Sequence, residues 1–223
     1  MSRQLLVSVL ATAAMLLVST SASAYVVLKL QNGDNLHWEV GTIEWQLNQG
    51  GMPGMTNAEL KGALEAAFDS WQDVECSNVQ FSFDGYKASD TDQGIWVTVQ
   101  NNSWDPAVGD ALAYALPTPT WGGEILSANI VFNAVDPQWS TSANPGYGFA
   151  DVQGVATHEI GHAIGLDHPR FRESTMFFSG SSTGLRTLED DDAHGACFLY
   201  PAYPFTIGLA CDACDDNSQC AGG

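Results

Sequence analysis

Residues 157–168 of the chain read Thr157-His-Glu-Ile-Gly-His-Ala-Ile-Gly-Leu-Asp-His168, and Met176 follows in the sequence Ser-Thr-Met-Phe. His158 and His162 are four residues apart. On a helix with about 3.6 residues per turn, their imidazoles leave the same face and can bind one ion. Glu159 lies one residue further round the helix, from which its carboxylate reaches the open side of that ion. The stretch therefore predicts a metal site and a candidate base on one helix.

A third histidine is expected to complete the site. Gly165 allows the helix to end, because glycine accepts the left-handed backbone conformation that follows many helices. The returning segment then brings His168 to the metal. Three neutral imidazoles at about 2.0–2.1 Å leave the fourth tetrahedral position to water, which is the layout of a catalytic zinc. The predicted ligands are therefore His158, His162 and His168, three of the five histidines in the chain.

The elongated histidine motif with a downstream methionine resembles the metzincin zinc metallopeptidases. A bare His-Glu-x-x-His occurs by chance in many helices that bind no metal, but here five spaced positions agree. Further residues are similar to the catalytic domain of the matrixin branch. Phe178 stands where the astacin-like and serralysin-like branches carry a tyrosine ligand. The matrixin likeness continues in residues 111–117, in Gly122-Gly123, in residues 129–133 and in the C-terminal stretch 188–200.

The matrixin resemblance implies an α+β fold of the metzincin type: a twisted mixed sheet with three main helices, and zinc in a cleft under an edge strand. It implies that the turn at Met176 forms an apolar floor beneath the imidazoles. A protein or peptide substrate would add as a strand to the backbone of Leu112 and Ala113. Animal matrixins hold a second, structural zinc through histidines, but Tyr114 and Val131 stand at the matching positions, so we expect one zinc. Calcium is a further candidate cofactor because matrixins usually carry it, although the acidic stretches lack calcium-loop spacing.

Strand and helix patterns divide the rest of the chain. Thr56-Asn-Ala-Glu59 is a capping box that opens a helix. Alternating or apolar runs predict strands at 42–47, 79–83, 95–99, 111–116 and 125–132. Residues 133–150 are rich in Asn, Pro, Gly and Ser and predict a long loop before the zinc helix, which Asp151 is expected to cap. The first helix has one apolar, core-facing side, formed by Leu60, Leu64, Phe68 and Trp71.

Residues 1–24 are typical of a signal peptide. Arg3 precedes an apolar run at 5–18, and Ala22-Ser-Ala24 offers a small-residue cleavage site. The run is shorter than the roughly 20 residues that span a bilayer, and no later stretch approaches that length. We therefore expect a secreted, extracellular protein without a membrane span. Its expected parts are the signal peptide (1–24), a matrixin-like catalytic domain (25–205) and a cysteine-containing tail (206–223), with no recognisable Pro-Arg-Cys-Gly prodomain switch.

Charge and cysteine content agree with export. The formal net charge of −19 disfavours binding to nucleic acid or to anionic membranes, because both need a basic surface.

Cysteines pair in oxidising compartments. Cys76 lies just past the first helix, and Cys197 lies near the end of the last one. In a matrixin-like arrangement these helices pack on the same side of the sheet, so we expect the two cysteines to form a disulfide; the alternative is two separately buried thiols. The tail holds the other three, Cys211, Cys214 and Cys220, which leave one unpaired.

Together these features predict a secreted zinc-dependent endopeptidase that hydrolyses extracellular proteins. Zinc would lower the pKa of its bound water to roughly 7 and polarise the substrate carbonyl. Glu159 would take the proton of that water and pass it to the leaving amine. The alternative is a secreted adhesion or binding module that keeps the scaffold with little turnover. Glu159 favours the enzyme, because a module without turnover needs no base.

Overall fold

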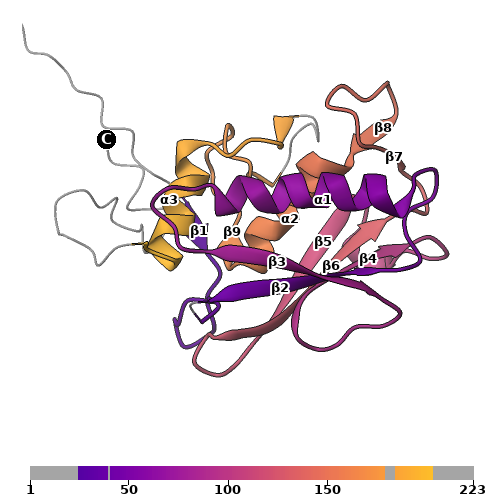
Figure 1. Ribbon diagram of the computed structural model, residues 1–223. Helices are drawn as coiled ribbons and strands as arrows, with labels where there is room; N and C mark the ends of the chain where they lie inside the picture. The colour runs from indigo at the N-terminus through magenta and orange to yellow at the C-terminus, as the bar shows by residue number, and fades with distance from the viewer. Residues whose placement is uncertain (1–24, 40, 179–183, 203–223) are drawn as a thin grey trace, which may run out of the picture.

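The computed structural model describes residues 25–39, 41–178 and 184–202, and within them a mixed five-stranded sheet forms the centre of the molecule (Figure 1). Its strand order is β3–β2–β4–β6–β5. The first four strands in that order pair in parallel, and the edge strand β5 is antiparallel to β6. The strands are β2 (Thr42–Asn48), β3 (Gln80–Lys87), β4 (Gly94–Gln100), β5 (Ala113–Pro119) and β6 (Ile125–Asn133).

Helix α1 (Asn57–Gln72) covers one side of the sheet, and the predicted capping box is present at its start. Thr56 Oγ1 accepts a hydrogen bond from the backbone N–H of Glu59, and Glu59 Oε2 accepts one from the Thr56 N–H. Both otherwise unpaired helix-end donors are thereby satisfied. The four apolar residues expected on the core side, Leu60, Leu64, Phe68 and Trp71, are all buried.

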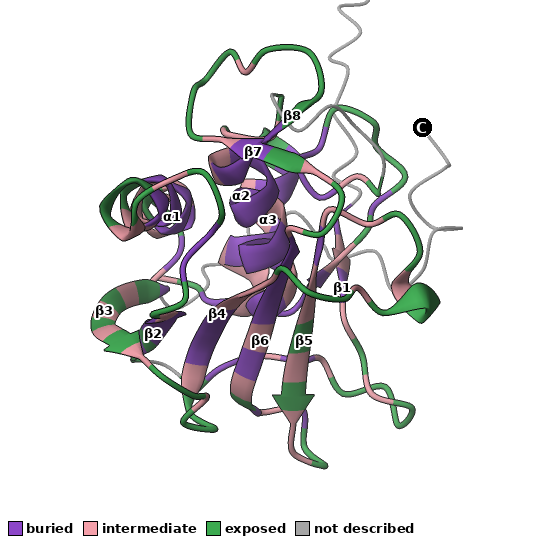
Figure 2. Cartoon of the chain, turned by 90° about the vertical axis from the view of Figure 1, so that its right-hand side faces the viewer, coloured by how far each residue is buried: buried purple, intermediate pink, exposed green. Residues whose placement is uncertain are grey.

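Helix α2 (Val152–Ala163) carries the histidine motif and lies on the same side of the sheet as α1. The Trp71 Nε1–H of α1 donates to the Thr157 carbonyl of α2 at 2.8 Å, which fixes the two helices to each other. Asp151 caps α2 as expected, because its side chain accepts a hydrogen bond from the Gln153 N–H. Figure 2 shows buried residues concentrated in α2 and in the parts of β4 and β6 next to it.

Gly165 follows the end of α2, and two observations explain why this residue is glycine. Its φ is +104°, which glycine adopts more readily than other residues. A Cβ atom at this position would also lie 2.3 Å from the Leu36 carbonyl oxygen. The last carbonyls of α2 are then satisfied from distant segments: Ala163 O accepts from Trp38 Nε1, and Ile164 O accepts from the Tyr200 hydroxyl.

Helix α3 (Asp190–Leu199) is the last described helix, and it starts within the acidic stretch. Three aspartates occupy its first turn, where negative charge is favoured by the helix dipole. Short strands complete the described fold: β1 (Val26–Val27) pairs with β9 (Leu166–Asp167), and β7 (Gln138–Ser140) pairs with β8 (Phe149–Asp151). The 3₁₀ turn η1 spans Pro106–Val108.

The structure corrects three of the expected boundaries. Strand β5 spans Ala113–Pro119 instead of the expected 111–116, so Leu112 lies just before it. Residues 133–150 are not one continuous loop, because they contain β7 and most of β8. Strand β3 runs on to Lys87 instead of ending at the Asp84-Gly85 pair. Gly85 has a φ of +102°, and the pairing with β2 shifts register there, so the Asp-Gly pair forms a bulge within the strand and not a turn.

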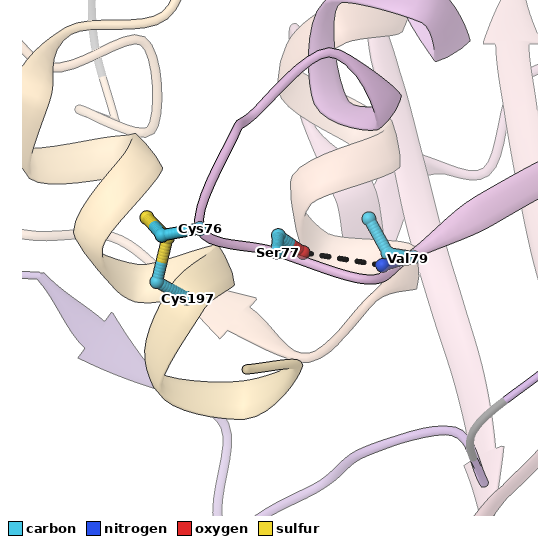
Figure 3. The surroundings of a disulfide bond; sticks show 4 residues. All are labelled: Cys76, Ser77, Val79 and Cys197. Atoms are coloured by element: carbon cyan, nitrogen blue, oxygen red, sulfur yellow. Dashed lines mark hydrogen bonds between the residues drawn. A yellow bond between two sulfur atoms is a disulfide. The ribbon is translucent and has the colours of Figure 1, made fainter. Parts of the chain in front are cut away.

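A disulfide joins Cys76, in the connection after α1, to Cys197 near the end of α3, the pair expected from the sequence (Figure 3). The two Cα atoms are 5.3 Å apart. Backbone hydrogen bonds on both sides reinforce the same junction: Asn78 N–H donates to Tyr200 O, and Ala202 N–H donates to Cys76 O. The last helix is therefore attached to the segment that enters β3.

Among the described residues, no helix is long and apolar enough to cross a membrane. The expected signal peptide (1–24) and the three tail cysteines, Cys211, Cys214 and Cys220, lie outside the described residues.

Removing the disulfide should destabilise the protein without changing the fold. For a cross-link between residues 121 apart, the chain-entropy model gives a loss of about 4 to 5 kcal/mol in the free energy of unfolding. Residual structure in the unfolded chain reduces this loss. Urea unfolding of the double variant Cys76→Ala/Cys197→Ala measures the loss. Mass mapping of unreduced wild-type peptides should recover the two cysteines in one linked peptide; Cys76 found free, or linked to a tail cysteine, contradicts the pairing.

Candidate active site and metal centre

The three predicted zinc ligands come together at the C-terminal half of α2. The Nε2 atoms of His158 and His162 are 3.2 Å apart, and that of His168 lies 3.1 and 3.0 Å from them respectively. His158 and His162 project from one face of α2, while His168 follows β9 on the returning segment. In the described part of the chain this is the one group of at least three His, Cys, Asp or Glu side chains that could share an ion.

Hydrogen bonds at the second ring nitrogen fix the orientation of two of the imidazoles. Nδ1 of His158 donates to the Thr175 carbonyl at 2.6 Å, and Nδ1 of His162 donates to the Leu166 carbonyl at 2.8 Å. In a neutral imidazole that donates from Nδ1, Nε2 carries the free lone pair. Both rings therefore present a lone pair to the centre of the group, as metal-ligating histidines do.

The protonation of the histidines also suits a cation. Burial lowers the pKa of His158 to about 4 and that of His162 to about 3, and burial is also the main cause of the lowered pKa of His168. All three rings are thus neutral near pH 7. Ligands of a tetrahedral zinc at about 2.0–2.1 Å lie about 3.3 Å from one another, a few tenths of an ångström from the spacing seen here. The donor set and its spacing fit zinc.

Glu159 faces the same cavity as the histidines without joining their group. Its side chain is buried, with 6% of the residue exposed, and its Oε2 atom has no hydrogen-bond partner within the protein. Burial raises the pKa of this carboxyl group to about 8. A buried carboxylate oxygen left unpaired by the protein is costly, and it is the kind of atom that a proton-transferring group needs.

Met176 lies beneath α2, fully packed. It is 2% exposed, and it fills the space that the absence of a side chain at Gly161 leaves on the helix. A Cβ atom at Gly161 would lie 2.2 Å from the Met176 sulfur and 2.8 Å from the Trp71 ring. The glycine within the motif is therefore required for the methionine turn to approach the helix.

The buried carboxylate of Asp192, in α3, holds the methionine turn in place. It accepts hydrogen bonds from the Ser174 hydroxyl at 2.5 Å, from the Thr175 N–H at 2.8 Å and from the Met176 N–H at 3.0 Å. The carbonyl of the same Thr175 accepts the hydrogen bond from His158. Helix α3 thus positions His158, a predicted zinc ligand, through one intervening residue.

A cavity of about 720 Å³ runs between the site and the edge strand β5. Ala113 is the first residue of β5, whereas Leu112 lies just before it, and both line the cavity. The Leu112 carbonyl accepts a hydrogen bond from the Asn133 N–H and so points toward β6. Because successive carbonyls of a strand point in opposite directions, the Ala113 carbonyl faces the free edge. Leu112 and Ala113 are both expected to bind substrate through their backbone. Of the two, Ala113 has the carbonyl that is open to an added strand.

Three contributions to the site are not evident from the sequence. Gly161 occupies an ordinary variable position of the motif. Asp192 belongs to a stretch whose only signal is its likeness to matrixins, and the position of Asp151 predicts a helix cap alone. Asp151 also forms an ion pair with Arg186. Each of these roles depends on a residue distant in sequence, which periodicity does not reveal.

Comparison with known proteins agrees with this geometry. A family model described as Matrixin matches residues 37–201. Metalloendoproteinase 2-MMP of Arabidopsis thaliana is 33% identical over 153 residues, which are 66% of this chain and 38% of that protein. Karilysin of Tannerella forsythia is 30% identical over 165 residues (72% and 32%), and matrix metalloproteinase-16 of Homo sapiens is 29% identical over 161 residues (66% and 25%). The matched stretch is thus well under half of each relative's length.

Substituting Gly161 by alanine should destabilise the site. The added methyl group collides with the Met176 sulfur and the Trp71 ring, and overpacking of this kind costs about 1–3 kcal/mol. Gly62→Ala is the matched control, since Gly62 lies within α1 with open space at its Cβ position and should gain about 0.5–1 kcal/mol. Urea unfolding measures both. Equal effects of the two substitutions would show that the methionine packing against α2 is unimportant.

Proposed function

Because this chain belongs to the matrixin family, we propose that it is a secreted zinc-dependent endopeptidase that hydrolyses peptide bonds of extracellular proteins. The observation that carries the proposal is the convergence of three neutral imidazoles beside a buried carboxylate whose Oε2 has no protein partner. His158, His162 and His168 would hold one zinc ion. When bound, zinc supplies a Lewis acid for the substrate carbonyl and lowers the pKa of a coordinated water.

Glu159 is the proposed general base. The ionised form of Glu159 would be favoured by the charge of a bound zinc ion, against the effect of burial on its pKa. The carboxylate would then accept a proton from the attacking water at Oε2, the atom that no protein group satisfies, and return it to the departing amine. Burial of the side chain excludes bulk water from this transfer. Met176 has no part in proton transfer; its packing against Gly161 supports the helix that carries two of the ligands.

The edge strand β5 is the proposed docking site for the substrate backbone. It borders the sheet beside the cavity and pairs with β6 alone, so its outer side can add an extended peptide. The backbone of Leu112 and Ala113, at the start of this strand, would meet residues near the bond to be cut. Recognition through main-chain groups suits proteins and peptides better than small molecules.

Export and the division of the chain are part of the same proposal. Residues 1–24 would be removed as a signal peptide, 25–205 would form the catalytic domain, and 206–223 would form the cysteine-containing tail. The disulfide between Cys76 and Cys197 supports an oxidising compartment. Calcium remains a candidate cofactor that rests on the family likeness, because in the described part of the chain no acidic group of three gathers as the histidines do.

The catalytic proposal is tested with Glu159→Gln. The substitution should retain zinc, since Glu159 is not a ligand, and should reduce casein hydrolysis by at least the roughly 10²–10⁴ typical of a lost general base. Near-normal hydrolysis by the variant would rule out this mechanism. Full zinc occupancy of the wild type without hydrolysis of casein or gelatin would favour the alternative, a secreted adhesion or binding module on the same scaffold.

Metal content provides a separate test. Metal analysis of the purified mature protein should give one zinc per chain, and a chelator should abolish hydrolysis until zinc is restored. His168→Ala should lose the metal, because two imidazoles alone bind zinc weakly compared with three. Stoichiometric zinc in that variant would show that the third ligand is assigned wrongly, and a reproducible value near two zinc ions would reveal a second site.

A further inference from the structure

Resting on the proposed peptidase function, we propose that Arg186 is a positioning residue that sets the wall of the substrate cavity and thereby determines which substrate side chains are accepted. Arg186 does not line the cavity itself, whereas its neighbour Leu185 does. Its guanidinium group is held by the buried carboxylate of Asp151, at the start of the zinc-ligating helix.

The ion pair is bidentate and largely desolvated. Arg186 Nε lies 2.6 Å from Asp151 Oδ2, and Nη2 lies 2.7 Å from Oδ1. Asp151 is completely buried, and the Arg186 side chain is 21% exposed. A paired geometry of this kind fixes the orientation as well as the position of the guanidinium, which a lysine ammonium does not reproduce.

Several elements meet at this pair. Asp151 ends β8 and caps α2, so it occupies the junction from which the zinc helix starts. Nη2 of Arg186 also donates to the Thr141 carbonyl at 2.9 Å, in the connection between β7 and β8. The guanidinium therefore connects the segment around Leu185 to α2 and to the loop beside it.

The backbone on either side of the guanidinium is anchored as well. The Arg186 carbonyl accepts a hydrogen bond from the Ser70 hydroxyl of α1, and the Thr187 carbonyl accepts one from the Thr175 hydroxyl beside the methionine turn. These contacts hold the backbone that follows Leu185, which lines the cavity. The salt bridge adds a side-chain contact that joins the same segment to the start of α2, and in our proposal this contact fixes how Leu185 meets the cavity.

The ligand triad shares one residue with this network, Thr175, whose hydroxyl donates to the Thr187 carbonyl and whose own carbonyl orients His158. The ion pair of Arg186 with Asp151 is separate from that contact. The His158 and His162 rings are oriented by the carbonyls of Thr175 and Leu166, and Arg186 touches neither ring. Loosening the cavity wall should therefore change the fit of substrate side chains while zinc binding persists. A purely structural ion pair would instead affect zinc content, turnover and all substrates together.

The test compares Arg186→Lys, Arg186→Met and Asp151→Asn in the full chain. Asn keeps the helix-capping oxygen, so Asp151→Asn removes the charge and leaves the cap. Lys87→Gln is the matched control, because Lys87 forms an exposed ion pair with Asp84 on β3, away from the cavity. Zinc content and thermal unfolding are measured for each variant.

Selectivity is read with two fluorogenic peptides that differ only in having leucine or alanine after the cleaved bond. Binding of two peptide hydroxamates with the same pair of side chains is measured in parallel, because it reports on the cavity even without turnover. Wild type should prefer leucine in both assays. Arg186→Lys and Arg186→Met should keep zinc and their kcat, and should lose about tenfold of the leucine preference, mainly through KM. Asp151→Asn should lose the same preference, whatever its effect on kcat, because Asp151 also caps the zinc helix.

An unchanged leucine-to-alanine ratio in all three variants overturns the proposal, as does a parallel loss of zinc and of activity on both peptides. A loss of selectivity in Lys87→Gln of the same size also overturns it. If no peptide is cleaved by the wild type, the proposed catalytic function fails, and the hydroxamate ratio still decides the role of Arg186.

Discussion

The hydrogen bonds accepted by the buried carboxylate of Asp192 connect α3 to the part of the molecule where the three histidines meet. Asp192 holds the backbone of Thr175 and Met176, and the Thr175 carbonyl orients His158. A charge-assisted hydrogen bond to a buried carboxylate is stronger than a neutral one, and losing such a partner inside a protein is expensive. The His158 imidazole can therefore keep one orientation because the Asp192 carboxylate, far from it in the sequence, holds the residue that accepts its hydrogen bond.

Two glycines provide the space in which that arrangement forms. At Gly161 the Met176 sulfur fills the space that a side chain would take, and at Gly165 the Leu36 carbonyl fills it. In both cases glycine is required because a distant part of the chain approaches the helix closely. The helix that carries the ligands is thus defined as much by what packs against it as by its own propensity, as is usual for short helices in proteins.

Local patterns are sufficient to predict much of this structure. The capping box at Thr56, the apolar side of α1, the cap at Asp151 and the turn at Gly165 follow from neighbouring residues, and the structure contains each of them. The spacing of the histidines is informative for the same reason, since helix geometry alone brings His158 and His162 together. The extension of β3 through Gly85 does not follow from the sequence, because an Asp-Gly pair suits a turn and a bulge equally well until the partner strand is known.

The remaining features depend on contacts between segments far apart in the sequence, and this has a consequence for how the protein matures. β1 pairs with β9, and the disulfide joins residues 121 apart. Asp192 and Cys197 are also among the last described residues to leave the ribosome. Closing such long loops is entropically costly and slow. A chain whose synthesis has not yet reached Asp192 therefore lacks the carboxylate that holds the methionine turn, and with it the support of the carbonyl that orients His158.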